Sequence, residues 1–169
     1  MKPKNVETHL QTVRILKIAT CLTLSGKAKL TYHIGLQDEA YIQFRIYASS
    51  GGGFYSNEWV AAKAIQQALS AETLVTAGSL HPLFKGKSAN TAGFLLAVLK
   101  QEGLVVRSTE NPRKYLRTES EAFVAEVQDL IESTVDLDPE SAPGKPSASS
   151  GKASAATPRS SSKAAKQKV

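Results

Sequence analysis

The sequence predicts an α+β fold, in which an N-terminal antiparallel β-meander is followed by helices, a short hairpin, an amphipathic helix and a disordered tail. Apolar and polar residues alternate between residues 13 and 48, which is typical of strands with one buried face. From residue 58 onwards the apolar residues recur at helical spacing, between residues that favour helix ends. After residue 137 the chain consists mostly of Ser, Ala, Pro, Gly and Lys, and it cannot bury enough apolar surface to fold.

The chain divides into five parts at points where the periodicity, the charge or the composition changes. The parts are a flexible lead-in (1–12), the β-meander (13–57), a helical region with a hairpin (58–118), an acidic amphipathic helix (119–137) and a disordered basic tail (138–169).

The meander is expected to contain three or four strands. Ser25-Gly26-Lys27 predicts the first hairpin turn, and residues 35–39 predict the second. The alternating pattern directs one set of side chains towards the core, namely Leu30, Tyr32, Ile34, Ile42, Phe44 and Ile46. The outward residues of the last strand are Tyr41, Gln43, Arg45 and Tyr47.

The helical region begins with a helix over about residues 58–69, which Ser56 or Asn57 caps and which has Trp59 available to a core. A short helical segment is expected within residues 72–86. Ile65 and Leu69 of the first helix are also available to a core. The apolar residues of the second segment that are expected to be buried are Leu74, Val75, Leu80, Leu83 and Phe84.

A longer third helix follows over about residues 89–102, with Ser88 as its cap and Gly103 as its terminator. Residues 104–107 and 114–117 predict two strands joined by a short loop. The last helix opens with a capping box formed by Thr118 and Glu121. Its apolar face consists of Phe123, Val127, Leu130 and Ile131.

The formal net charge of +6 is distributed unevenly. Residues 1–59 carry +3 and residues 60–118 carry +5, whereas residues 119–140 carry −8. Residues 141–169 contain six lysines or arginines and no acidic residue. The tail therefore accounts for the positive excess of the chain, and a polyanionic partner is expected.

Several classes of protein are excluded by composition. The single cysteine, Cys21, cannot form an internal disulfide, and His9, His33 and His81 lack metal-ligand spacing, so no metal site is expected. No apolar stretch approaches the roughly 20 residues of a membrane span, and no secretory signal is evident. The glycine runs lack the Lys-Ser/Thr of a phosphate loop, and no catalytic constellation is present. We therefore expect a cytoplasmic protein that is not an enzyme and that uses no cofactor.

The order of elements over residues 58–118 resembles a winged helix-turn-helix domain. The resemblance is carried by the run that starts with Ser88-Ala89-Asn90-Thr91 and ends with Glu102-Gly103-Leu104-Val105, followed by the cationic hairpin Arg107 to Arg117. This resemblance implies that the third helix enters the major groove of DNA and that the hairpin, or wing, contacts the backbone or the minor groove.

The residues in this region suit such an interface. Short polar side chains at the start of a helix can approach base edges, and backbone N–H groups there can meet phosphate. Asn is the natural bidentate partner of adenine, which makes Asn90 a candidate base contact. The candidate DNA-binding residues are Lys85, Lys87, Ser88, Asn90, Thr91, Lys100, Arg107, Arg113, Lys114 and Arg117.

The tail looks like the Ser/Ala/Lys/Pro-rich tails of histone-like bacterial proteins and linker histones. Well-spaced cations on a flexible chain add sequence-independent, salt-sensitive affinity for a duplex. The tail cations are Lys145, Lys152, Arg159, Lys163, Lys166 and Lys168. We accordingly expect a bacterial, nucleoid-associated protein that binds double-stranded DNA, either as a transcriptional regulator or as a nucleoid-type accessory protein, with no membrane and no small-molecule substrate as a partner.

Two other interpretations remain open. The wing and the sheet could bind a partner chain, which would make the protein an interaction adaptor without nucleic acid. Alternatively, Tyr41, Arg45 and Tyr47, with Lys29 and His33, could form an aromatic and basic platform for single-stranded nucleic acid. The sheet or the last helix could also form a homodimer surface.

Overall fold

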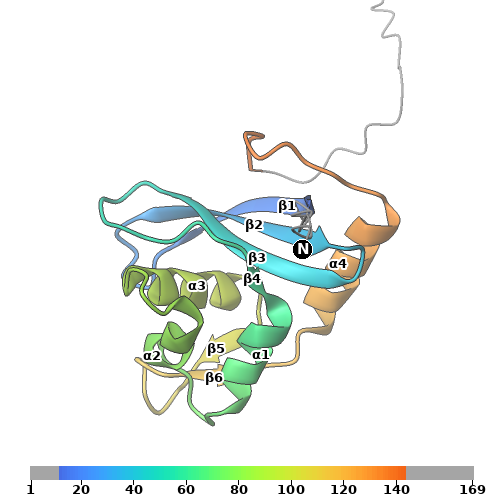
Figure 1. Ribbon diagram of the computed structural model, residues 1–169. Coiled ribbons are helices and arrows are strands. Elements are labelled where there is room, and N and C mark those ends of the chain that lie inside the picture. Colours follow the sequence, from blue (N-terminus) through green and yellow to red (C-terminus); the bar gives the residue numbers. More distant parts are fainter. Residues whose placement is uncertain (1–11, 144–169) are drawn as a thin grey trace, which may run out of the picture.

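A computed structural model describes residues 12–143 of the chain. The predicted lead-in and almost all of the predicted tail, with its six cations, lie outside these residues. The described part is an α+β arrangement with a four-stranded antiparallel sheet, a two-stranded sheet and four α-helices (Figure 1). The predicted fold class is therefore confirmed at this level.

The larger sheet has the strand order β1-β2-β3-β4, and all neighbours are antiparallel. Its strands are β1 (Val13–Leu22), β2 (Lys29–Gln37), β3 (Tyr41–Ser49) and β4 (Val60–Ala61). Gly26 has a left-handed backbone (φ 71°) in the first turn, as the sequence predicted. The second turn is shorter than predicted, because β2 continues to Gln37 and only Asp38 and Glu39 adopt the left-handed conformation.

The start of the first helix was predicted incorrectly. Residues 58–61 are not helical, and Val60 and Ala61 form β4, which pairs with Phe44 and Gln43 of β3. This pairing satisfies backbone groups at the edge of the sheet, a long-range gain that local helix propensity does not include. Helix α1 (Ala62–Ser70) begins only after it.

The remaining elements agree with the predicted order. They are α2 (Ala77–Leu80), the 3-10 helix η1 (His81–Phe84), α3 (Asn90–Gln101), β5 (Val105–Arg107), β6 (Tyr115–Arg117) and α4 (Glu121–Glu132). Gly103 ends α3 with a φ of 75°, as predicted. Val75 pairs with Tyr115 through two backbone hydrogen bonds of 2.7 and 2.9 Å, so the segment before α2 lies beside the β5–β6 hairpin.

Helix α3 lies between the larger sheet on one side and α2 with the β5–β6 hairpin on the other (Figure 1). It contacts β1 and β3 towards the sheet, and α2, η1 and β5 elsewhere. Seven of its twelve residues are buried, because apolar side chains cover most of its circumference. The inward residues Leu30, Tyr32, Ile34, Phe44 and Ile46 of the sheet share one core with those of α3, as the alternating pattern predicted.

Helix α4 covers one end of the same sheet face (Figure 1). Its buried residues Val127 and Leu130 pack against Leu16 and Leu36, and Leu16 projects from a bulge in β1 at which the strand register shifts. The predicted capping box is wrong in detail, because Ser120 is the cap and its Oγ accepts a 3.1 Å hydrogen bond from the backbone N–H of Phe123.

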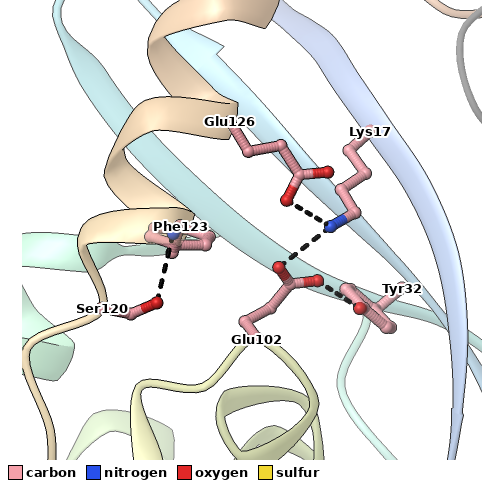
Figure 2. Close-up of polar contacts among 6 residues, drawn as sticks. All are labelled: Lys17, Tyr32, Glu102, Ser120, Phe123 and Glu126. Carbon is pink, nitrogen blue, oxygen red and sulfur yellow. Dashed lines mark hydrogen bonds and ion pairs between the residues drawn. The ribbon is translucent and has the colours of Figure 1, made fainter.

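A buried polar cluster joins the sheet, α3 and α4 (Figure 2). The carboxylate of Glu102, only 4% exposed, accepts hydrogen bonds from the Tyr32 hydroxyl and, at 3.0 Å, from Lys17 Nζ. Lys17 also donates to Glu126 on α4 at 2.9 Å. Burial lowers the pKa of Lys17, but the two carboxylates outweigh this effect and hold that pKa above its ordinary value.

The only cysteine of the chain, Cys21, lies near this cluster at the end of β1. It is buried in the main core. Burial, reinforced by the negative charge of Glu102, raises the pKa of its thiol to about 11.

Removing the central carboxylate should destabilise the fold strongly. We expect Glu102→Ala to lower the free energy of unfolding by about 3 kcal/mol, because it leaves the buried Tyr32 hydroxyl without its partner and leaves Lys17 with only the half-exposed Glu126. Glu126→Ala removes the 48% exposed partner of Lys17 and should cost about 0.5 kcal/mol. Urea unfolding followed by circular dichroism measures both values, and equal losses for the two variants would contradict this account of the cluster.

Candidate nucleic-acid interface

Two arginines of the β5–β6 hairpin converge on one groove. Arg107 at the end of β5 and Arg113 just before β6 both line a hollow of about 490 Å³. The opposite side is formed by the β1–β2 turn at Leu24 and Ser25, together with the first residues of α2. No Asp or Glu lines this groove, so the field of the two guanidinium groups is not cancelled there.

The loop that presents Arg113 is held by local hydrogen bonds. Asn111 Oδ1 accepts from the backbone N–H of Arg113 at 3.1 Å, and the carbonyl of Asn111 accepts from Lys114 N–H at 2.9 Å. Ser108 is buried, and its Oγ accepts from Asn111 N–H at 3.2 Å. Arg113 is therefore attached to a defined turn, which reduces the conformational freedom that its backbone would lose on binding a ligand.

The other predicted cations do not gather at this groove. Lys85 and Lys100 are exposed, and Lys87 is exposed but forms a 2.9 Å ion pair with Glu58. Hydrogen bonding to Lys87 lowers the pKa of Glu58. Arg117 donates to Ser70 Oγ of α1 at 2.6 Å and lines a different groove.

The start of α3 is occupied by contacts within the protein. Thr91 is 1% exposed, and its Oγ1 accepts from Ser56 N–H at 2.9 Å, so the expectation that Thr91 contacts DNA is corrected. Asn90 remains exposed, but its side-chain amide donates to the carbonyl of Phe54 at 3.2 Å. Ser88 is half-buried, and its Oγ accepts from Asn90 N–H at 3.4 Å. Two of these polar side chains therefore anchor the loop over residues 51–57.

Three residues of the platform considered above, His33, Arg45 and Tyr47, cluster on the outer face of the sheet, and Trp59 joins them. The Arg45 guanidinium carbon lies 4.4 Å from the centre of the Trp59 ring and 5.4 Å from that of Tyr47. Tyr47 also stacks on His33 with 4.3 Å between ring centres. Most of these aromatic faces are therefore used within the cluster, while Tyr41 is 57% exposed.

The Trp59 ring can lie close to the sheet only because the residue beneath it, Gly35, has no side chain. A Cβ atom at position 35 would lie 2.8 Å from the Trp59 ring and 2.4 Å from Val13. The expectation that Trp59 belongs to the first helix is thus replaced by a role on the sheet face. Its position could not be read from helical spacing, because it depends on the pairing of β4 with β3.

An acidic segment lies against part of this sheet face. The Tyr47 hydroxyl donates to Glu140, and Ile15 exchanges hydrogen bonds with residues 136 and 137. The hydrogen bond with Glu140 is the main reason that the pKa of Tyr47 is raised. The platform is therefore bound, at least at Tyr47, by a segment of the same chain.

Sequence reasoning also missed the polar cluster around Glu102. A carboxylate in the last turn of an apolar helix is opposed by the helix dipole, so Glu102 before Gly103 was a signal that a cationic partner is present. The partner Lys17 lies 85 residues away in the sequence, and no local pattern identifies it.

Comparison with known proteins gives no identification, because no protein family, no curated protein and no solved structure matches this chain. Within residues 12–143, no helix has the length and apolar character needed to cross a membrane. The same residues contain no group of three His, Cys, Asp or Glu side chains placed to hold a metal ion.

The buried imidazole of His33 should make stability depend on pH. Burial, with the nearby charge of Arg45, lowers the pKa of His33 to about 4. The folded chain therefore excludes a proton that the unfolded chain binds below its ordinary pKa of about 6.5. The contribution of His33 to the free energy of unfolding is therefore fully present above pH 6.5. It is lost as the pH falls from about 6.5 towards 4, by at most about 1.4 kcal/mol per pH unit.

His33→Gln removes this titration. Urea unfolding of both proteins between pH 4 and pH 7 should therefore give a shallower decline in the free energy of unfolding for the variant. Parallel declines for the two proteins would show that His33 is not the group that titrates.

Proposed function

We propose that the protein binds double-stranded DNA without enzymatic activity, and that residues 58–118 act as a winged helix-turn-helix unit. The order α1, α2, α3, β5, β6 supports this proposal, as does the bridge between Val75 and Tyr115 that joins the first inter-helix segment to the hairpin. The observation that carries the proposal is the convergence of Arg107 and Arg113 on a groove without acidic side chains. Guanidinium groups are well suited to phosphate oxygens.

The mode of binding differs from the one that the family resemblance implied. The central part of α3 lies beneath the sheet, so it offers little side-chain surface to base edges. We propose instead that the hairpin groove and the exposed Lys85 contact the phosphate backbone. Contacts of this kind carry little sequence information, which favours a nucleoid-type accessory protein over a sequence-specific regulator.

The tail cations belong to the same proposal as a source of nonspecific affinity, although they lie outside the described residues. They carry the positive excess of the chain, and cations spread over residues 145–168 can contact several phosphates. A nucleoid location in the cytoplasm follows from this proposal and depends entirely on it.

A second candidate, binding of single-stranded nucleic acid, is favoured by the cluster of Arg45, Tyr47 and Trp59 on the outer sheet face. Free aromatic faces are required for base stacking. Tyr47 and His33 already stack on each other, and Glu140 binds the Tyr47 hydroxyl, so this candidate is second.

Loss of the two groove arginines should weaken duplex binding. We expect Arg107→Ala with Arg113→Ala to reduce the affinity of the full chain for a random duplex of about 30 base pairs by about tenfold near 50 mM salt, and to lower the salt slope by about two. Fluorescence anisotropy over a salt series measures both quantities. Lys63→Ala, an exposed cation on α1 outside the groove, is the control and should change the affinity by less than about twofold.

Failure of the full chain to bind duplex near 50 mM salt would overturn the proposed function. Tighter binding to a random single strand than to duplex, unaffected by the two arginine substitutions, would instead favour the sheet face.

The tail contribution can be tested by charge removal. Substituting Gln for all six tail cations in the full-length chain should lower the salt slope of duplex binding by as much as about five, since each phosphate contact contributes roughly 0.9. An unchanged salt slope would show that the tail does not contact DNA.

A further inference from the structure

A second groove lies between α1 and α4 and shares no lining residue with the arginine groove. It has a volume of about 810 Å³. One wall is a single face of α1, formed by Ala62, Ile65, Gln66, Leu69 and Ser70. The other wall is a face of α4 formed by Glu121, Val124, Ala125 and Gln128. Each set follows the i, i+3, i+4, i+7 spacing of a helix surface that packs against another helix.

The groove has an apolar base and an exposed apolar rim. Phe44, Leu99, Leu104 and Phe123 lie along its base. Val124 on the α4 wall is 65% exposed, although it is a large apolar side chain. A helix about 10 Å wide with a pitch of 5.4 Å occupies roughly 420 Å³ per turn, so the groove has room for about two turns of helix.

The charge around the groove is negative on the α4 side. Glu119 and Glu121 line it, and Arg117 is the only cation that does so. Helix α4 carries four carboxylates and no cation. Of these four carboxylates, only that of Glu126 forms an ion pair within residues 12–143, and its partner is Lys17. Glu132 in the last turn of α4 also opposes the helix dipole. A cationic occupant would offset this unpaired charge.

A second copy of the chain does not fit these charges. Symmetric pairing through α4 would place two acidic helices against each other, and residues 119–140 carry −8 in each copy. Residues 144–169 of the same chain are cationic, but Val169 is their only large apolar residue, so they lack the side chains to fill an apolar groove.

We propose that the groove between α1 and α4 binds an amphipathic helix of another protein, with an apolar stripe flanked by Lys or Arg. The apolar stripe would cover Val124 and the aromatic base, and the flanking cations would face Glu119 and Glu121. The protein would then hold a partner protein through a surface separate from its proposed DNA contacts.

The probe is a labelled synthetic helix of about 14 residues in which Leu forms one stripe and Lys the rest. Fluorescence anisotropy with the full-length chain should show binding that is at least about tenfold tighter than that of a peptide of the same composition in scrambled order, or of a Leu–Glu peptide with the same stripe. Equal binding of the scrambled peptide would overturn the proposal, because affinity would then reflect charge alone.

Val124→Lys provides the site test, and Leu22→Lys is its matched control. Both residues are exposed apolar side chains, at 65% and 61%, and both substitutions add one positive charge, but Leu22 lies outside the groove. We expect about tenfold weaker binding of the Leu–Lys peptide to the Val124 variant and less than about twofold change for the control. Equal effects would overturn the proposed site.

Two further measurements separate the other outcomes. Sedimentation equilibrium should show a monomer, and a dimer that Val124→Lys dissociates would overturn the proposal in favour of a second copy. Duplex affinity of the Val124 variant should equal that of the unsubstituted chain, so that failure of this proposal and failure of DNA binding remain distinguishable.

Discussion

The apolar surface of α3 extends around most of its circumference, and this single constraint organises the described fold. A helix of that kind has to be covered on opposite sides, so the sheet packs over it from one side while α2, η1 and β5 contact it elsewhere. Glu102 then joins its C-terminal end to β1 and α4 through Lys17. What remains available to ligands is the periphery, namely the hairpin, the loops, the outer face of the sheet and the groove between α1 and α4.

Much of this arrangement could be predicted from local patterns. Alternation predicted β1, β2 and β3, and the glycine at position 103 predicted the end of α3. Three of the failures share one physical cause, since each depends on a contact between residues distant in the sequence. Strand pairing with β3 displaced the start of α1. The loop around Ser56 buried Thr91, and Glu102 found its partner across 85 residues. Arg107 and Arg113 were predicted as candidates, but their shared groove depends on the β1–β2 turn.

The two surfaces for which we propose partners have opposite electrostatic character. The hairpin groove is lined by two arginines and no carboxylate, whereas the α1–α4 groove has acidic side chains along the α4 wall. Because the electrostatic potentials of the two grooves have opposite signs, the arginine groove would repel a cationic helix and the α1–α4 groove would repel DNA. This repulsion would give specificity at little cost in affinity. Binding at one surface also leaves the side chains of the other uncovered.

Cys21 gives the molecule an internal reporter of its own motions. Because the chain has no second cysteine, a thiol reagent has one point of attack, and burial keeps that thiol protonated and enclosed while β1 rests on α3. Modification must therefore await a local opening of the sheet from the helix beneath it. The ratio of the reaction rate of the native protein to that of an exposed thiol would give the free energy that separates the closed core from its opened state, without any added label site.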